Sequence, residues 1–281
     1  MILRNMNGLK NKDLTILVVS YDGYSDMWPD FFNCKKINWP DCPFETVIAN
    51  NEKSFDFDNV RVINCGKSAQ WSTRTRIALE AINTKYVCFL LEDFFISEKV
   101  DTSVINDVLT TMESNNLKYY KLMSLSKIAT PYFDKHKGER TIPANLKYGV
   151  SLLAAIWDRE YFLSLVGKED YNPWRFEIER NQDAEAAGTD TTLCGLYNEK
   201  NILKICHMVV QGKYLPSSVK RMRSLGFDIN VGERGCHSCF YEYKNSLKDK
   251  LYPLLRKSRI ASSIAAALGV ETVTSKNQSK K

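Results

Sequence analysis

The sequence lacks the features that mark several classes of protein. No part of its 281 residues approaches the 18 consecutive apolar residues that a transmembrane helix needs. The polar segment 1–13 contains no apolar signal-peptide core, so we expect a cytoplasmic protein. No Gly-x-Ser-x-Gly sequence is present, which argues against a serine hydrolase built on that turn.

Histidine is scarce, and the cysteines lack the partners that metal sites and disulfides need. Nothing indicates secretion, so the eight cysteines are expected to be reduced and mostly buried. Cys236 and Cys239 have the spacing of zinc ligands, but no second pair accompanies them. Cys206 and His207 are far from this pair in the sequence and could complete a zinc site only if the fold happened to bring them close. A zinc site is therefore disfavoured.

Positive charge is concentrated at one end of the chain. The net charge is +6, whereas residues 244–281 carry nine Lys/Arg and two Asp/Glu, a balance of +7. The other 243 residues therefore sum to −1, which argues against a nucleic-acid-binding body. A helix with a basic start and one apolar face is predicted from Pro253 to Leu268. It either lies on an anionic membrane surface or packs on the body.

The first half of the chain alternates short apolar strands with helices. Strands are predicted at 14–20, 44–49, 60–63 and 86–91, and helices at 26–33 and 71–82. This alternation predicts an α/β fold with a mainly parallel central sheet flanked by helices. Ligands bind at the carboxyl ends of the strands in such sheets. The polar residues there are Tyr21-Asp22, Asn50-Asn51, Gly66-Lys67-Ser68 and Glu92-Asp93.

The second half is more mixed. Helices are predicted at 101–115 and 159–166, and strands at 119–125, 152–157 and 203–211. The polar segment 130–145 contains Pro and Gly and is interpreted as a loop that closes over the site.

Two groups at the predicted sheet edge suit a nucleoside diphosphate. Glu92 and Asp93 follow a buried strand, and carboxylates there suit magnesium or manganese that bridges phosphates. The alternative is that these acids end the strand and begin a turn. Arg74 lies near the start of the helix 71–82, on the face of Trp71, where it can bind phosphate. The alternative for Arg74 is a surface ion pair.

The order of these elements, with the Tyr-Asp-Gly turn, the Asn-Asn pair and the acidic pair, resembles GT-A glycosyltransferases. The resemblance covers roughly residues 14–215. The chain has Glu92-Asp93 where the family has Asp-x-Asp, which puts metal dependence in question. The stretch 21–28, Tyr-Asp-Gly-Tyr-Ser-Asp-Met-Trp, also resembles bacterial capsule and surface-polysaccharide transferases.

The resemblance implies a GT-A-like catalytic domain over 1–243, with a donor half at 14–100 and an acceptor half at 101–243, followed by the basic tail 244–281. The donor is a nucleoside diphosphate sugar, with a UDP-sugar favoured, and the acceptor is a hydroxyl of a surface glycan or lipid-linked glycan. A divalent cation, Mn²⁺ or Mg²⁺, is implied with Glu92, Asp93 and His207 as its ligands. The implied donor-binding residues are Ser20, Tyr21, Asp22, Asn50, Trp71, Arg74, Glu92, Asp93 and Lys213. A structural role is the alternative for His207.

The segment 172–179 resembles the acceptor side of inverting GT-A enzymes. There Trp174 would contact a sugar, and Glu177, three residues further along a helix, would be the general base. Glu179 and Asp183 are the reserve candidates. The alternative is an exposed acidic helix start.

Two rival functions remain open at this point. A sugar nucleotidyltransferase needs a Gly-rich phosphate loop after the first strand, whereas the segment 21–26 has one glycine. A non-catalytic carbohydrate- or nucleotide-binding protein on the same fold would retain the donor without turnover.

Overall fold

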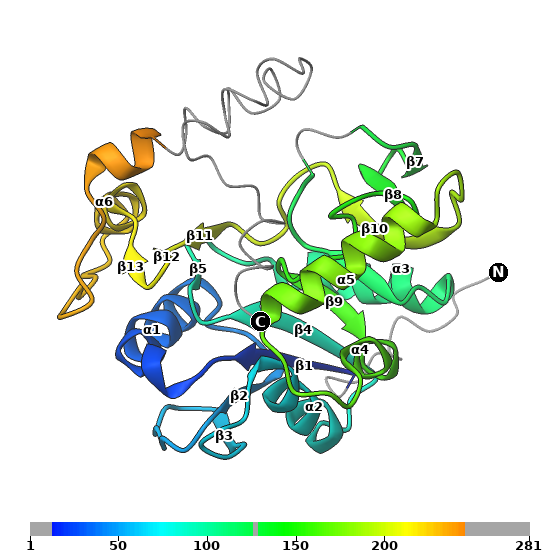
Figure 1. The fold of residues 1–281 in the computed structure, drawn as a ribbon. Coiled ribbons are helices and arrows are strands. Elements are labelled where there is room, and N and C mark those ends of the chain that lie inside the picture. Colours follow the sequence, from blue (N-terminus) through cyan, green and yellow to red (C-terminus); the bar gives the residue numbers. More distant parts are fainter. Residues whose placement is uncertain (1–12, 126–128, 245–281) are drawn as a thin grey trace, which may run out of the picture. The chain divides into compact units, whose positions relative to one another are not determined.

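The computed structural model describes residues 13–125 and 129–244, and it is drawn in Figure 1. The chain divides into two compact units. The first unit comprises residues 1–208 and 222–230, and the second comprises 209–221 and 231–281. Part of the predicted acceptor half therefore belongs to the second unit. The predicted tail helix lies outside the described residues.

The first unit is built on a nine-stranded sheet with the strand order β3-β2-β1-β4-β9-β6-β10-β8-β7. Its strands are β1 Leu14–Val19, β2 Glu45–Asn50, β3 Val60–Asn64, β4 Tyr86–Leu91, β6 Tyr119–Lys121, β7 Tyr132–Asp134, β8 Glu139–Pro143, β9 Ala155–Asp158 and β10 Leu193–Asn198. β9 and β8 run against the other strands. The predicted α/β fold with a mainly parallel central sheet flanked by helices is confirmed.

Helices lie against this sheet. They are the 3-10 turn η1 Asp22–Met27, α1 Trp28–Asn38, α2 Trp71–Ala81, α3 Thr102–Ser114, α4 Arg159–Val166 and α5 Pro173–Ala186. Leu17 and Phe89 belong to a core cluster that residues of α2, α4 and α5 complete, as the grouping of these helices in Figure 1 shows. Ile16 and Leu90 alternate with them on the other face and are equally buried. β1 and β4 are therefore buried on both faces, which explains their mostly apolar sequences.

Three expectations about the second half need correction. The segment 130–145 is not a lid, because it contains β7 and β8, which pair with each other and join the sheet through β10. Gly138, at φ +69°, makes the turn between the two strands. The strand expected at 119–125 ends at Lys121. The strand expected at 203–211 is two short strands, β11 Ile205–His207 and β12 Val209–Val210.

The remaining elements are small. β5 Phe94–Ile96 pairs with β11 in the first unit, and β12 pairs with β13 Lys213–Tyr214 in the second. A last helix, α6, is formed by Pro216–Ser224. Within residues 13–125 and 129–244, no helix is long and apolar enough to span a membrane.

Candidate functional site

The strand pairing brings the predicted polar residues to one edge of the sheet. β1, β2, β3 and β4 are parallel neighbours, so the residues that follow them share an edge. β9 is antiparallel to β4 with Ala155 opposite Phe89, so the segment before β9 reaches the same edge. Lys121, the last residue of β6, pairs with Ala155 and lies there too. This edge of the first unit is the candidate site.

Asp22 and Asn50 meet as predicted, but their polar atoms shape the chain around the site. The Asp22 carboxylate accepts hydrogen bonds from Asn50 Nδ2 at 3.1 Å and from the backbone N–H groups of Glu52 and Lys53. Asn50 is fully buried and also donates to the Lys53 carbonyl at 2.6 Å. Asn50 Oδ1 is buried without a hydrogen-bond partner among the described residues, and the predicted contact of Asn50 with a nucleoside stays a prediction. Both side chains hold the turn after β2.

Ser20 and Trp71 are also buried, and their predicted donor contacts stay predictions. The Ser20 hydroxyl is buried and accepts a hydrogen bond from Trp28 Nε1 at 2.8 Å. Trp71 is 3% exposed, and its ring packs against Phe176 at a centroid distance of 5.3 Å. Trp71 lies on the apolar face of α2, and its indole is therefore part of the core.

Asn51 has a positioning role that the sequence did not assign. It was recognised as a polar residue at the sheet edge. Its Nδ2 lies 3.0 Å, 3.2 Å and 3.0 Å from the carbonyl oxygens of Gly66, Lys67 and Ala69. These carbonyls belong to the segment that leads into α2. One buried amide therefore fixes the approach to the helix that carries Arg74.

Arg74 points toward the candidate site, as its place on the inner face of α2 predicted. Its guanidinium donates to the Ala69 carbonyl and lies 5.8 Å from the Tyr21 ring centroid. Burial lowers the pKa of Arg74, and the negative charge of Glu92 acts against this. Its Nε is buried and has no hydrogen-bond partner among the described residues. A buried donor without a partner is costly, and an anionic ligand would satisfy it.

Asp93 and His207 are brought together by the pairing of β5 with β11. β5 was not predicted, whereas β11 lies within the strand expected at 203–211. His207 Nε2 is 2.7 Å from Asp93 Oδ2. Burial disfavours the charged imidazole, but the hydrogen bond and charge of Asp93 outweigh it, so the pKa of His207 is raised. The other oxygen, Asp93 Oδ1, is buried without a hydrogen-bond partner in the described chain. The structure thus places this pair as predicted, while its role stays a prediction.

The predicted three-residue metal shell is not assembled. In the described ranges, no three His, Cys, Asp or Glu side chains come together as a metal site. Glu92 is 7% exposed and interacts with Arg74. Asp93 suits a cation that keeps several ligands from phosphates and water, because magnesium is often held by one or two protein groups. The hydrogen bond to Asp93 occupies His207 Nε2, so only Nδ1 of that ring could bind a metal. The unpartnered Asp93 Oδ1 is the acceptor that suits such an ion.

Glu177 lies beside the segment that leads into β9, and its role as the general base stays a prediction. Its Oε1 accepts a hydrogen bond from the Leu152 N–H at 2.6 Å, and Leu152 lies three residues before β9. Burial raises the pKa of the Glu177 carboxyl, and the Leu152 N–H and the charge of Lys121 oppose that rise. A carboxylate with a raised pKa is a better proton acceptor than a solvent-exposed one.

The reserve candidates are less suited to the role. Arg175 Nε lies 2.8 Å from Glu179 Oε1, and an Arg180 nitrogen lies 2.8 Å from Asp183 Oδ2. Both acids are therefore paired along α5. Trp174, on the same helix, is 68% exposed and leaves its ring open to a sugar.

Other predicted residues lie outside this edge or beyond its description. Lys213 belongs to the second unit, on β13, and its phosphate contact stays a prediction. Cys236 and Cys239 are exposed free thiols in the same unit. His237, between them, hydrogen bonds to the Val210 carbonyl at 2.7 Å and stacks on Tyr241, so it has a structural role.

A cavity of about 720 Å³ lies elsewhere in the first unit. It is lined by the end of α1, the segment before β2 and the first residues of β3, including Trp39, Phe57 and Arg61. These are the amino ends of β2 and β3, the edge opposite the candidate site. None of the predicted site residues lines it. The cavity is therefore not part of the candidate site.

Comparisons with known proteins give distant structural similarities. No protein-family model matches the chain, and no curated protein sequence does. A cytidylyltransferase from Leptospira borgpetersenii is 10% identical over 79% of this chain and 99% of its own, with a TM-score of 0.42. S. aureus TarS 1–349 in complex with UDP is 12% identical over 79% of this chain and 68% of its own, also at 0.42. The bifunctional IspDF from Campylobacter jejuni is 11% identical over 69% and 52%, at 0.40. The chain spans about half of IspDF, and at these scores the similarity carries no argument about activity.

Proposed function

We propose that the chain is a glycosyltransferase that moves a sugar from a nucleoside diphosphate sugar to a glycan hydroxyl, with inversion. The observation that carries this proposal is that Arg74 and Glu177, a buried cation and a part-buried acid, lie at the same edge of the sheet. A buried arginine with an unpartnered N–H suits the phosphates of the donor. A carboxylate with a raised pKa suits the acceptor hydroxyl.

The described residues divide the reaction between them. Tyr21 is 42% exposed beside Arg74 and is the residue that contacts the nucleoside. Arg74 stabilises the negative charge that develops on the leaving diphosphate. Glu177 takes the proton of the acceptor hydroxyl. The acceptor oxygen forms a bond to the donor sugar carbon as the bond from that carbon to the diphosphate breaks. Bound manganese or magnesium, held by Asp93 and His207, would supply further positive charge beside the diphosphate.

The first test is a thermal-shift screen with UDP, GDP, CMP and dTDP, each with and without Mn²⁺. A nucleotide that binds the folded protein stabilises it by about 2.7 kcal/mol at 100 times its Kd, and we expect one nucleotide to raise Tm. A rise that grows with Mn²⁺ in the wild type but not in Asp93→Asn would assign the cation site. No rise with any nucleotide, in protein shown to be folded, would refute the donor site.

The second test separates catalysis from binding. We expect Glu177→Gln to keep the nucleotide-dependent rise in Tm and to lower the release of nucleotide from the matching sugar donor about 10²- to 10⁴-fold. Glu160→Gln is the matched control, because Glu160 is an exposed acid on α4, 70% accessible and paired with Arg159. If wild-type protein binds nucleotide but never turns over a donor, the chain is a binding protein instead.

A further inference from the structure

Tyr148 combines two features that rarely occur in one residue. Its φ is +59°, in the left-handed region that non-glycine residues seldom adopt. Its side chain is 63% exposed, although it is a large aromatic residue. Strained backbone of this kind persists only where its surroundings enforce it, and it is concentrated at ligand-binding sites.

Two side chains from other elements hold Tyr148 in this conformation. Its backbone N–H donates to Asn181 Oδ1 on α5 at 2.8 Å, and its carbonyl accepts from Lys121 Nζ on β6 at 2.8 Å. Lys121 is fully buried, and its desolvated amino group donates a hydrogen bond to this carbonyl. The next residue, Gly149, has Ile142 and the Leu146 carbonyl within 3 Å of where a Cβ would be. The position of Tyr148 is therefore built in and rigid.

This segment runs along α5 past Glu177. Tyr148 is tied to Asn181, whereas Leu152 is tied to Glu177, one turn nearer the start of the helix. Trp174 lies a further turn in the same direction and is exposed. Residues 174, 177 and 181 share one helix face. Trp174 and Asn181 are seven residues apart, about 10 Å along the axis.

We propose that Tyr148 is a second sugar-binding residue, so that the acceptor is a chain of at least two sugars that lies along α5 across Glu177. This inference rests on the proposed function, because it assigns the acceptor class of the same site. Tyr and Trp provide rigid, amphipathic contact surface at little entropic cost, which suits the faces of sugar rings. A single monosaccharide does not span the roughly 10 Å of helix between Trp174 and Asn181, the residue that holds Tyr148.

The test uses the full chain labelled with 5-fluorotryptophan and ¹⁹F NMR, with the Trp174 signal assigned by Trp174→Phe. The probes are linear neutral tetrasaccharides of hexoses and N-acetylhexosamines and the matching monosaccharides. We expect a tetrasaccharide to move the Trp174 signal with a Kd at least tenfold below that of its monosaccharide. Tyr148→Ala should remove this advantage and leave monosaccharide binding unchanged, whereas Tyr148→Phe should retain it. Tyr132→Ala, which removes another exposed tyrosine on β7, is the control.

The outcomes separate this inference from the proposed function. Equal affinities for tetrasaccharide and monosaccharide, or an unchanged tetrasaccharide Kd in Tyr148→Ala, overturn the second subsite. So does the absence of tetrasaccharide binding in protein whose Tm rises with nucleotide, and the proposed function then stands. Tetrasaccharide binding that depends on Tyr148, in protein that binds no nucleotide, supports the subsite and refutes the transferase. A cooperative thermal unfolding transition without added nucleotide, measured for each variant, shows that it is folded.

Discussion

Lys121 gives the site an electrostatic property that can be measured. Burial lowers the pKa of its amino group to about 8, against the opposing effect of Glu177. An unfolded lysine titrates near 10.4, so the folded protein releases this proton first. Below pH 8 the folded state contains a buried charge, and that penalty disappears as the pH rises from 8 to 10.4.

We therefore expect Lys121→Met to change the pH dependence of stability. Relative to this variant, the wild-type free energy of unfolding should rise by roughly 2–3 kcal/mol between pH 7 and pH 10. Urea denaturation of both proteins at each pH measures the difference. Lys118→Met is the control, because Lys118 is 43% exposed. A constant difference between wild type and Lys121→Met would show that the Lys121 pKa is close to that of a free lysine.

The residue scale also shows where sequence reasoning succeeds and fails. The positions of Asp93 and Arg74 at the sheet edge were predictable, because one follows a buried strand and the other lies on the inner face of a helix. Lys121 and Tyr148 were missed. A lysine after two tyrosines is normally placed at the surface, and nothing in a local pattern predicts a positive φ at a tyrosine. Both depend on contacts between β6, α5 and a turn that are distant in sequence.

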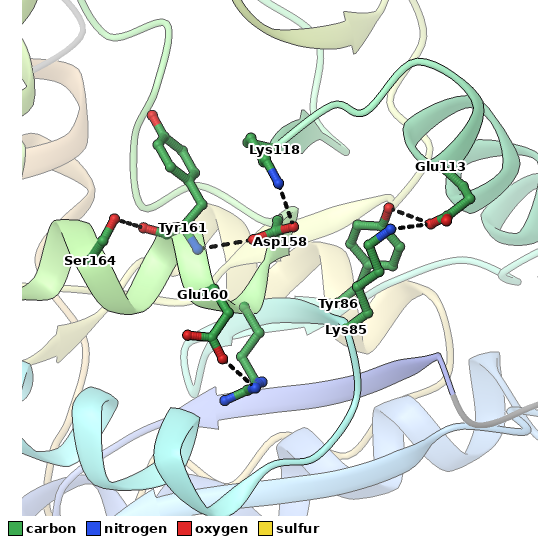
Figure 2. Close-up of polar contacts among 9 residues, drawn as sticks. Lys85, Tyr86, Glu113, Lys118, Asp158, Glu160, Tyr161 and Ser164 are labelled. Carbon is green, nitrogen blue, oxygen red and sulfur yellow. Dashed lines mark hydrogen bonds and ion pairs between the residues drawn. The ribbon is translucent and has the colours of Figure 1, made fainter.

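At the scale of elements, Asp158 connects a strand to a helix. It ends β9, and its Oδ1 accepts the Tyr161 N–H at 2.9 Å, which caps α4. Its Oδ2 lies 3.0 Å from Lys118 Nζ, as Figure 2 shows. Beside it, Lys85 and Tyr86 at the start of β4 both bind Glu113 on α3. These contacts lie at the edge opposite the candidate site, so changes here test the scaffold alone.

Asp158→Ala should lower the free energy of unfolding by about 1–2 kcal/mol, because the cap is lost. Asp158→Asn should cost about 1 kcal/mol or less, since asparagine caps equally well and only the part-buried ion pair with Lys118, whose side chain is 43% exposed, is lost. Chemical denaturation measures both. If the two variants lose the same stability, the ion pair and not the cap holds this junction.

Prediction of the elements followed their apolar content. β1 and β4 lie entirely within short apolar runs, and both were predicted within one residue of their bounds. The hairpin of β7 and β8 was missed because its sequence is polar. Glu139 is nonetheless buried there, with Tyr120 donating to its carboxylate at 3.2 Å. A strand stabilised by such a contact has no hydrophobic pattern to reveal it.

For the whole molecule, charge separates the body from its end. The balance of +7 over residues 244–281 leaves the rest of the chain nearly neutral. We propose that this end attracts the protein to anionic membranes, where each Lys or Arg near the surface contributes about 1 kcal/mol. A chain ending at residue 244 should lose sedimentation with vesicles of anionic lipid, and keep its nucleotide-dependent rise in Tm. Equal sedimentation of both chains, at low and at high salt, would refute the proposal.

The place of β9 in the sheet determines the order in which the chain can assemble. β3, β2, β1 and β4 come first in the sequence and can pair among themselves. β6 follows, but it cannot join them, because its neighbour on that side is β9. The ribosome must therefore add the 67 residues from 92 to 158 before β4 has its second partner. At ordinary synthesis rates that takes roughly 3–13 s. Throughout this interval the nascent chain presents an open, apolar strand edge, the kind of surface on which aggregation begins and which chaperones protect.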